Sequence, residues 1–489
     1  MKSDEIKQKT ITATKWSSIT EILSKVITPI INMVLARILA PEAFGILATV
    51  TMVISFAEVF VESGFQKFLI QHEFKSDKEE QEYTSVAFWT NLVFSLLIWG
   101  IIVLFQKQIA KIAGNDGLGH VIAISGVMIP MYGIIGIQNC IIKKKLQFRK
   151  LFYVRIPSAL VPLVITLPLA LIGFDYWALV IGNIAGVLIR SVLLVIIGGY
   201  KPQWYFNYTH LKFMLRFGMI TLLDGLAIWA TSWVDSLLIA AAMSEYQLGL
   251  YKNSVGTITT LFNIVSAAVT PVLYASLSRL QNDDEAFRDV FAGTQKILCT
   301  FLLPMGAGVY LYKDLATKIL FGDAWSEASF IIGITAVTLA FRTIFVSFNS
   351  EAYRAKGKFY IPLLLQLLDL AILIPTCIIS SQISFETLVY ARAIARLDLV
   401  IPGFLLLYMV CHISFFGTLK SLLPNFIAVS VMWGAALLLQ SIGTSMIWSF
   451  ASIVCCVFVY FGVLALFKKD RKMIMEFISN LFSKLKRRA

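Results

Sequence analysis

Long apolar stretches alternate with short polar loops along almost the entire chain. Fourteen of them are long enough to cross a bilayer, which requires about 20 mostly apolar residues. We place these spans approximately at residues 16–38, 46–70, 85–106, 119–142, 152–173, 176–199, 217–242, 254–277, 290–312, 328–350, 359–380, 387–410, 421–441 and 445–467. Because lipid offers no partner to backbone polar groups, such spans are expected to be helices. The pattern predicts an all-α membrane protein with fourteen transmembrane helices.

The overall composition agrees with this pattern. Hydrophobic residues make up 58% of the 489 residues, charged residues only 15%, and the mean hydropathy is +0.78. These values exclude a soluble globular protein. The first span contains Glu21 and Lys25 and lacks a small-residue cleavage site, so it is not expected to be a cleaved signal peptide.

Basic residues are concentrated on one side of the predicted spans. If the N-terminus is cytoplasmic, 30 of the 42 Lys and Arg residues lie in cytoplasmic segments and five in outer loops. This asymmetry follows the positive-inside rule and predicts that both termini are cytoplasmic. The net charge of +13 is thereby explained by topology, and no nucleic-acid partner is expected.

Residue types that usually carry catalysis or bind metals are scattered. The six cysteines lie in spans or at their cytoplasmic edges, the four histidines lie near membrane edges, and neither type has metal-ligand spacing. The loops are short, and the sequence contains neither GxxxxGKS nor GxxxxGKT, the nucleotide-binding motif. We therefore expect no enzyme activity, no cofactor and no resident metal. Transport by such a chain would need an ion gradient, the membrane potential, or consumption of the substrate on the far side.

The segment 468–489 is basic and amphipathic. Its apolar residues Met473, Phe477, Leu481 and Leu485 recur at every fourth position, with basic residues at both ends. This pattern predicts an interfacial helix attracted to anionic lipids. A topological anchor is the simpler interpretation, and a regulatory role is the alternative.

Two pairs of segments point to an internal repeat. ARILAPEAFGIL at 36–47 corresponds to AAAMSEYQLGLY at 240–251 with an offset of 204, and NCIIKKKLQF at 139–148 to NSEAYRAKGK at 349–358 with an offset of 210. These offsets pair span 1 with span 7 and span 4 with span 10. An even number of spans in each repeat makes the repeats parallel, related by an axis along the membrane normal.

The repeat predicts how the chain is organised. We expect an N-lobe of spans 1–6 in residues 1–200, a C-lobe of spans 7–12 in 201–415, spans 13 and 14 in 416–467, and a cytoplasmic tail in 468–489. Two six-helix lobes around a central cavity are typical of alternating-access transport.

Polar residues form stripes at helical spacing in four spans. The members are Glu21, Lys25, Thr28 and Asn32 in span 1; Thr51, Ser55, Glu58, Glu62 and Gln66 in span 2; Thr221, Asp224, Thr231 and Asp235 in span 7; and Thr260, Asn263, Thr270 and Tyr274 in span 8. The stripes predict that these four helices line one water-accessible cavity.

Seven of the cations inside the predicted spans are candidates for a site, because an uncompensated charge there is costly. They are Lys25, Arg37, Arg155, Arg190, Arg342, Arg392 and Arg396. Arg392 and Arg396 are one helical turn apart, and the planar fork of arginine suits phosphate or pyrophosphate. The alternative is that the cations form structural ion pairs with intramembrane acids, and that Arg37, Arg155 and Arg190 snorkel to a membrane edge.

The candidate site residues fall into two groups. Those for pyrophosphate or sugar are Lys25, Asn32, Arg37, Asn263, Arg342, Arg392 and Arg396. Those for a coupling H⁺ or Na⁺ are Glu58, Glu62, Asp224 and Asp235, for each of which a salt bridge is an equally good explanation.

An ordered set of short motifs resembles the polysaccharide flippases of the MOP exporter superfamily. In chain order the motifs are ARILAPEAFGIL, VESGFQKFLIQ, IIKKKLQFRKL, DYWALV, LGLYKNS, PVLYASLSRLQND, ILFGDAW and RAKGKF, between residue 36 and about residue 358. Within that superfamily the sequence looks most like the Wzx-type and teichuronic-acid-type exporters.

The resemblance implies a fold like that of MATE transporters and the lipid II flippase. It also implies a function, the flipping of undecaprenyl-pyrophosphate-linked oligosaccharide repeat units across the bacterial inner membrane by alternating access, for cell-surface polysaccharide biosynthesis. The expected partners are this lipid-linked oligosaccharide, membrane lipids, a coupling H⁺ or Na⁺, a polysaccharide polymerase and a chain-length regulator.

The same resemblance also has implications for individual residues. Lys25 and Arg37 fall at basic positions of the lipid II flippase, whereas Ile31 stands where that family has another arginine. An ion-coupled multidrug/cation antiporter of the same superfamily is the alternative function. A membrane enzyme, such as a polysaccharide polymerase or an acyltransferase, would be expected to carry a large external loop or a catalytic His or Asp pair.

Overall fold

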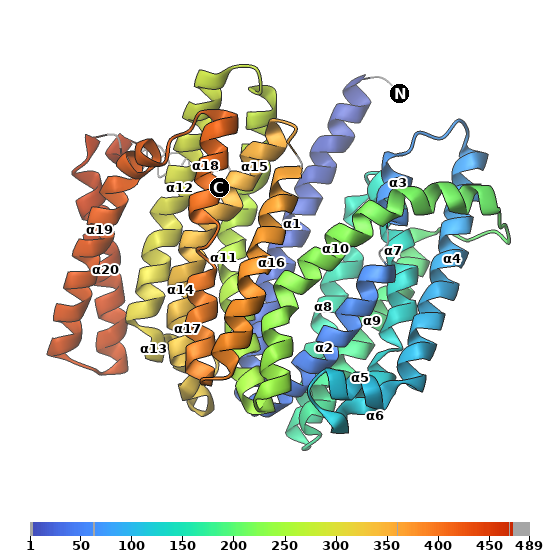
Figure 1. Cartoon of the computed structure of the whole chain (residues 1–489), viewed down its shortest axis with the longest axis horizontal. Coiled ribbons are helices and arrows are strands. Elements are labelled where there is room, and N and C mark those ends of the chain that lie inside the picture. Colours follow the sequence, from blue (N-terminus) through green and yellow to red (C-terminus); the bar gives the residue numbers. More distant parts are fainter. Residues whose placement is uncertain (1–2, 62–63, 359, 469, 473–489) are drawn as a thin grey trace, which may run out of the picture. The chain divides into compact units, whose positions relative to one another are not determined.

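The computed structural model describes residues 3–61, 64–358, 360–468 and 470–472, and these residues form helices joined by turns and loops, without a strand (Figure 1). Thirteen helices within these ranges are long and apolar enough to cross a membrane. The remaining predicted span, 254–277, lies within α11 (Glu245–Arg279), which at 35 residues has the length to cross. The predicted all-α membrane fold is confirmed, and the protein is a multi-pass membrane protein.

The chain divides into two compact units, Met1–Asn253 with Leu370–Val389, and Ser254–Asp369 with Tyr390–Ala489. Unit 1 contains α1 (Ser3–Ala36), α2 (Pro41–Val61), α3 (Phe65–Gln71), α4 (Asp77–Leu104), α5 (Gln106–Ile112), η1 (Asp116–Leu118), α6 (Gly119–Ser125), α7 (Met128–Lys144), α8 (Phe148–Leu171), α9 (Asp175–Gly198), α10 (Tyr208–Ala242) and the start of α11. It also contains the end of α16 (Tyr360–Ser381) and the start of α17 (Phe385–Ala395).

Unit 2 contains the rest of α11, α16 and α17. Its other elements are α12 (Asp284–Leu311), α13 (Lys313–Leu320), η2 (Asp323–Ala328), α14 (Ser329–Arg342), η3 (Thr343–Ser347), α15 (Phe348–Ala355), α18 (Val400–Cys411), α19 (Phe415–Ile442) and α20 (Met446–Ala465). Within it, α12 packs against α14 and α19, and α19 packs against α20. The buried amide of Asn425 joins three of these helices, because it donates to Thr300 Oγ1 (2.9 Å) and to the Tyr460 hydroxyl (3.2 Å).

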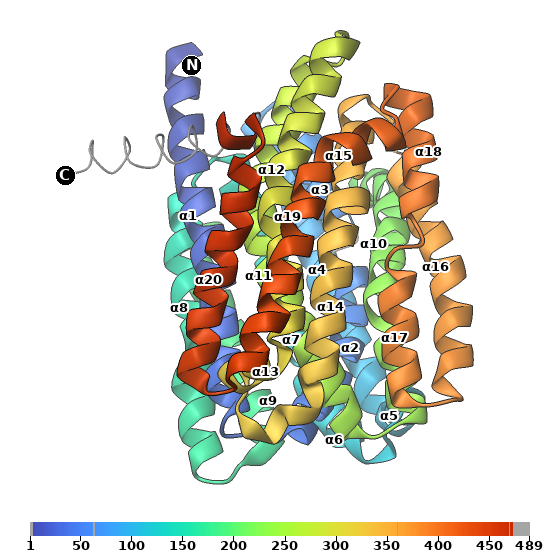
Figure 2. The ribbon, with the colours of Figure 1, turned by 90° about the vertical axis from the view of Figure 1, so that its left-hand side faces the viewer.

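Four predicted spans are not single continuous α-helices. The span predicted at 46–70 runs past the end of α2 into α3, and the span predicted at 119–142 consists of α6 and the main part of α7. The span predicted at 328–350 consists of α14, the π-helical turn η3 and α15, and the span predicted at 387–410 consists of α17 and α18 with a turn between them (Figure 2). No Pro or Gly occurs in η3 or in the turn at 396–399, so neither interruption has the usual sequence marker. Interruptions of this kind at membrane depth are tolerated where protein surrounds the freed backbone groups.

Two segments aligned by the repeat touch one another within unit 1. A Cβ atom on Gly45 of α2 would collide with the carbonyl oxygen of Glu245, and a Cβ atom on Gly249 would collide with the carbonyl oxygen of Pro41. Gly45 and Gly249 are 204 residues apart, and so are Pro41 and Glu245. In the repeat, Gly45 corresponds to Gly249 and Pro41 corresponds to Glu245. The contact of Gly45 with Glu245 is therefore equivalent to the contact of Gly249 with Pro41, and the two contacts form a local two-fold arrangement.

The connection between α9 and α10 is held firmly on α4. The Trp89 indole N–H donates to the carbonyl of Gln203 (2.8 Å), and its ring stacks on Trp204 at 4.2 Å between centroids. The Ser85 hydroxyl bonds the Tyr200 hydroxyl (3.1 Å) and accepts from the Gln203 N–H (3.2 Å). Burial raises the pKa of the Tyr200 phenol, so it is neutral at ordinary pH. The next helix begins at Tyr208, before the predicted 217, because the Asn207 side chain caps it.

The bond from Trp89 gives a test of this attachment. Trp89→Phe keeps an aromatic ring but removes one hydrogen bond worth about 1 kcal/mol, so the connection should open severalfold more often. Chymotrypsin cleavage after the exposed Phe206 should accelerate accordingly. Trp99→Phe on the same helix removes a comparable bond, to Ala123 (3.0 Å), and is the matched control. Equal cleavage rates in the two variants would contradict the attachment.

Candidate functional site

A polar pocket of about 320 Å³ lies in unit 1 between α1, α8 and α9. Its polar lining consists of Ser24, Arg155, Ser158, Asn183 and Arg190. Arg155 donates from Nη1 to Glu21 Oε1 at 2.6 Å, and this ion pair fixes the position of its guanidinium at the side of the pocket. Pro162 and Gly186 provide small or flat surfaces that keep the space open. The pocket therefore presents two arginines and several neutral hydrogen-bonding groups within a membrane-spanning unit.

Both arginines lie inside their spans and not at the ends. Arg155 is seven residues from the start of α8, and Arg190 is eight residues from the end of α9. At 1.5 Å per residue these separations are about 10 Å and about 12 Å. Charges at such depth require partners or a ligand.

A smaller polar pocket of about 140 Å³ adjoins the first. Asn183 and Val187 line both pockets, and the second is also lined by Glu58 and Tyr132. The two arginines and this acid are therefore arranged around Asn183, which offers both a donor and an acceptor.

Unit 2 contains a cluster of buried charges on α14, α16 and the α17–α18 turn. The guanidinium of Arg342 donates to Asp369 Oδ2 at 2.8 Å and reaches the carbonyl oxygen of Arg396 at 3.5 Å. The Arg396 side chain is only 4% exposed and lies 3.4–3.5 Å from the hydroxyls of Thr335 and Thr338. Arg392 and Asp369 are 6% and 1% exposed. The cluster thus brings three arginines and the carboxylate of Asp369 together in the interior of unit 2.

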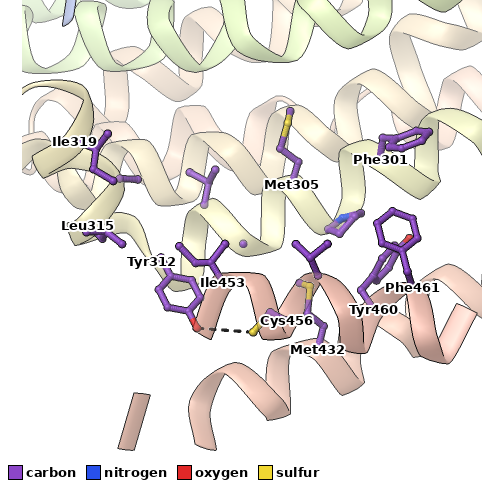
Figure 3. A pocket seen from close by; sticks show the side chains of 15 residues that line it. Phe301, Met305, Tyr312, Leu315, Ile319, Met432, Ile453, Cys456, Tyr460 and Phe461 are labelled. Atoms are coloured by element: carbon purple, nitrogen blue, oxygen red, sulfur yellow. Dashed lines mark hydrogen bonds between the residues drawn. The ribbon is translucent and has the colours of Figure 1, made fainter. Parts of the chain in front are cut away.

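An apolar pocket of about 410 Å³ lies elsewhere in unit 2, between α12, α13, α19 and α20 (Figure 3). Phe301, Met305, Met432, Ile453 and Phe461 line it. Its few polar atoms include the Tyr312 hydroxyl, which bonds Cys456 Sγ at 3.7 Å. The lining suits a hydrocarbon chain and not a hydrated ligand.

Residues 34–330 match the family model described as "Polysaccharide biosynthesis protein". The chain belongs to this family. It is 24% identical over 307 residues to the succinoglycan biosynthesis transport protein ExoT of Rhizobium meliloti (strain 1021), a match that covers 62% of this chain and 61% of that protein. It is 22% identical over 431 residues to the lipopolysaccharide biosynthesis protein WzxC of Escherichia coli (strain K12), covering 86% of this chain and 83% of the relative.

Solved structures agree on the fold of this polysaccharide biosynthesis family member. The lipid II flippase MurJ, in an inward closed conformation, superimposes with a TM-score of 0.76 at 16% identity, covering 93% of this chain and 98% of MurJ. An inward-facing MATE multidrug transporter of the MOP superfamily gives a TM-score of 0.64 at 14% identity, with coverages of 82% and 98%. The resemblance to MOP-superfamily flippases, and the MATE/lipid II flippase-like fold, are confirmed.

The residues predicted to bind substrate are distributed over both units of this protein. Arg342, Arg392 and Arg396 lie in the unit 2 cluster, with Arg342 in the ion pair that the structural alternative expected. Lys25 and Asn32 are half-buried on α1, and Arg37 is exposed in the turn that follows this helix. Asn263 is exposed on α11. Whether any of these residues binds substrate stays a prediction.

The residues predicted to bind a coupling ion have different surroundings. Asp235 is 5% exposed and well satisfied, because it accepts from the Tyr251 hydroxyl (2.7 Å) and the Ser236 N–H (2.6 Å). Asp224 lies 4.0 Å from Lys67 in a partly exposed pair. Glu58 lines the smaller unit 1 pocket, and Glu62 and the amphipathic tail from Met473 onward lie outside the described residues. Ion coupling through these acids also stays a prediction.

The sequence analysis left Arg155, Arg190 and Asn183 out of the candidate set. Arg155 and Arg190 were interpreted mainly as snorkelling residues, because a basic loop follows or precedes each span. The distance of Arg155 and Arg190 from the ends of their helices is the feature that favours a site over snorkelling. Asn183 carries no comparable signal, since a lone amide in an apolar span occurs in many packed helices.

Proposed function

We propose that this protein translocates undecaprenyl-pyrophosphate-linked oligosaccharide repeat units from the cytoplasmic to the outer leaflet of the bacterial inner membrane, by alternating access. Both termini would be cytoplasmic. The observation that carries the proposal is the polar pocket of unit 1, in which Arg155 and Arg190 line about 320 Å³ inside a member of the polysaccharide biosynthesis family. A polymerase and a chain-length regulator are the expected partners.

The chemistry of such a substrate matches the pockets. Pyrophosphate is an anion that arginine recognises with paired hydrogen bonds. A sugar hydroxyl transferred to hydrocarbon without a partner costs several kcal/mol, and Ser24, Ser158 and Asn183 can replace its water. The apolar pocket of unit 2 has the lining that an isoprenoid chain requires (Figure 3).

The alternative, export of cationic drugs, fits the larger unit 1 pocket poorly. Its charged lining residues are the two arginines, which would repel an organic cation. Glu58 lines only the smaller neighbour and is a weaker argument for a cation site.

The double variant Arg155→Gln/Arg190→Gln tests the proposal. Each lost charge-assisted hydrogen bond is worth about 1.5–3 kcal/mol, so transport should fall at least tenfold. The measurement is flipping of a fluorescent lipid-linked oligosaccharide in proteoliposomes, together with surface polymer in cells at matched protein levels. Arg149→Gln changes an exposed arginine on the same helix, outside the pocket, and should leave transport near normal.

Undiminished transport in Arg155→Gln/Arg190→Gln would contradict the role of this pocket. Cells that lack the gene, accumulate cationic drugs and still build normal polysaccharide would favour the antiporter instead.

A further inference from the structure

Two helix interruptions of unit 2 meet the same buried charges. The π-helical turn η3 begins directly after Arg342, and the turn between α17 and α18 begins at Arg396 (Figure 2). Arg342 bridges them, since its guanidinium reaches the Arg396 carbonyl oxygen at 3.5 Å. Helix interruptions are frequent at functional sites because they free backbone groups and give a side chain a new direction.

Asp398 lies in this turn and is not satisfied. Both of its carboxylate oxygens are buried, and no described side chain donates a hydrogen bond to either. The donor beside them is the backbone N–H of the adjacent Leu399. The backbone N–H of Asp398 donates to the Ala395 carbonyl oxygen at 3.2 Å, so the backbone donor is satisfied and the carboxylate is the group that lacks a side-chain partner.

The charged groups around Asp398 are already engaged. Arg342 on α14 pairs with Asp369 on α16, and Arg396 lies against the Thr335 and Thr338 hydroxyls. Arg392 on α17 also contributes to the field at Asp398 and has interactions of its own. Asp369 is the second carboxylate, and it repels a negative charge on Asp398.

These observations restrict what Asp398 can hold. An ionised buried carboxylate without a partner costs several kcal/mol, and three arginines close by did not form a hydrogen bond with it. A metal cation would neutralise it, but three guanidinium groups disfavour a further positive ion. A proton neutralises the group and converts one oxygen to a donor.

We infer that Asp398 is a proton-binding site that gains and loses a proton in this conformation. When the acid releases its proton to water, a second carboxylate appears beside Asp369 and competes for Arg342. Movement of Arg342 would also release the carbonyl of Arg396, so proton loss would change the geometry of the turn between α17 and α18. A proton gradient could drive transport through this turn. That coupling rests on the proposed flippase function, whereas the protonation does not.

Infrared spectroscopy of the purified full-length protein in lipid bilayers tests the protonation without any substrate. A protonated carboxylic acid has a C=O stretching band distinct from that of a carboxylate, and the band shifts in D₂O. We expect such a band in the wild type, its loss on titration to high pH, and its absence in Asp398→Asn. Asp323→Asn, which changes an exposed acid at the end of another helix, should keep the band.

Asparagine is nearly isosteric with the protonated acid, so Asp398→Asn should fold with an unchanged melting temperature. The inference is overturned if the wild type lacks the band wherever it is folded, or if Asp398→Asn keeps it. It is also overturned if Na⁺, but not K⁺, stabilises the wild type and Asp398→Asn abolishes that effect, because the site would then hold a metal ion.

Transport measurements distinguish proton binding at Asp398 from the coupling of that proton to transport. Export by the wild type should respond to an imposed pH gradient, and export by Asp398→Asn should not. A titrating Asp398 with gradient-independent export would overturn the coupling and leave the proton site standing. No export by the wild type, with the infrared result as expected, would count against the flippase function alone.

Discussion

Replacing Arg342 by leucine should destabilise the protein by about 3–5 kcal/mol, the usual cost of breaking a buried ion pair from one side. The substitution strands Asp369, which is 1% exposed and bonded to Arg342 at 2.8 Å. It also removes the donor that faces the Arg396 carbonyl oxygen. The loss should appear as a lower unfolding midpoint in detergent or bicelles, followed by intrinsic tryptophan fluorescence, to which the buried Trp325 of the same unit contributes.

Two further variants define what the Arg342 experiment measures. The double variant Arg342→Leu/Asp369→Leu should recover most of the lost stability, because no buried charge remains without a partner. Lys318→Leu breaks a pair of similar length, 2.9 Å to Asp323, whose side chains are 55% and 81% exposed. That control should cost at most about 1 kcal/mol. If Arg342→Leu cost no more than Lys318→Leu, the ion pair would have no structural importance.

The contact between the two repeat segments should be equally intolerant of added volume. Gly249→Ala places a methyl group against the Pro41 carbonyl, and Gly45→Ala places one against that of Glu245. Backbone cannot move aside as a side chain can, so each substitution should cost about 3 kcal/mol, the upper end for overpacking. The two losses should be similar, because the contacts are counterparts. Thermal unfolding and the yield of folded protein are the measurements.

Gly256→Ala on the same helix α11 is the matched control for Gly249→Ala. A Cβ atom at Gly256 meets open space, and alanine favours a helix over glycine by up to about 1 kcal/mol. Gly256→Ala should therefore be neutral or stabilising. Destabilisation of the same size in both variants would show that the close approach does not matter.

The sequence predicted the membrane helices well because burial in lipid imposes a simple rule on each span. Apolar length alone located α8, α9 and α20, and no knowledge of their neighbours was required. The interruptions were different. Thr343–Ser347 and the turn at 396–399 contain neither Pro nor Gly, so the usual marker of a helix interruption is missing from the sequence.

Site residues were harder to predict than helices, since a charged residue within a span gives the same sequence pattern whether it binds a ligand or pairs with a neighbouring helix. Arg342 pairs with Asp369, whereas Arg155 pairs with Glu21 and also lines a pocket, as Arg190 does. The distinction depends on which helices pack side by side, and a single sequence does not specify this. Nothing in the sequence around Asp398 indicates that its carboxylate lacks a side-chain partner, and this emerged from the three-dimensional arrangement.

The reciprocal packing of Gly45 and Gly249 has a consequence for the origin of the chain. When residue i of one copy meets residue j of the other and j meets i, the arrangement is that of an isologous interface between identical subunits. Here the two copies lie on one polypeptide, 204 residues apart. A half-length ancestor would have made this contact as a homodimer, and gene fusion would then have turned a subunit interface into an internal one.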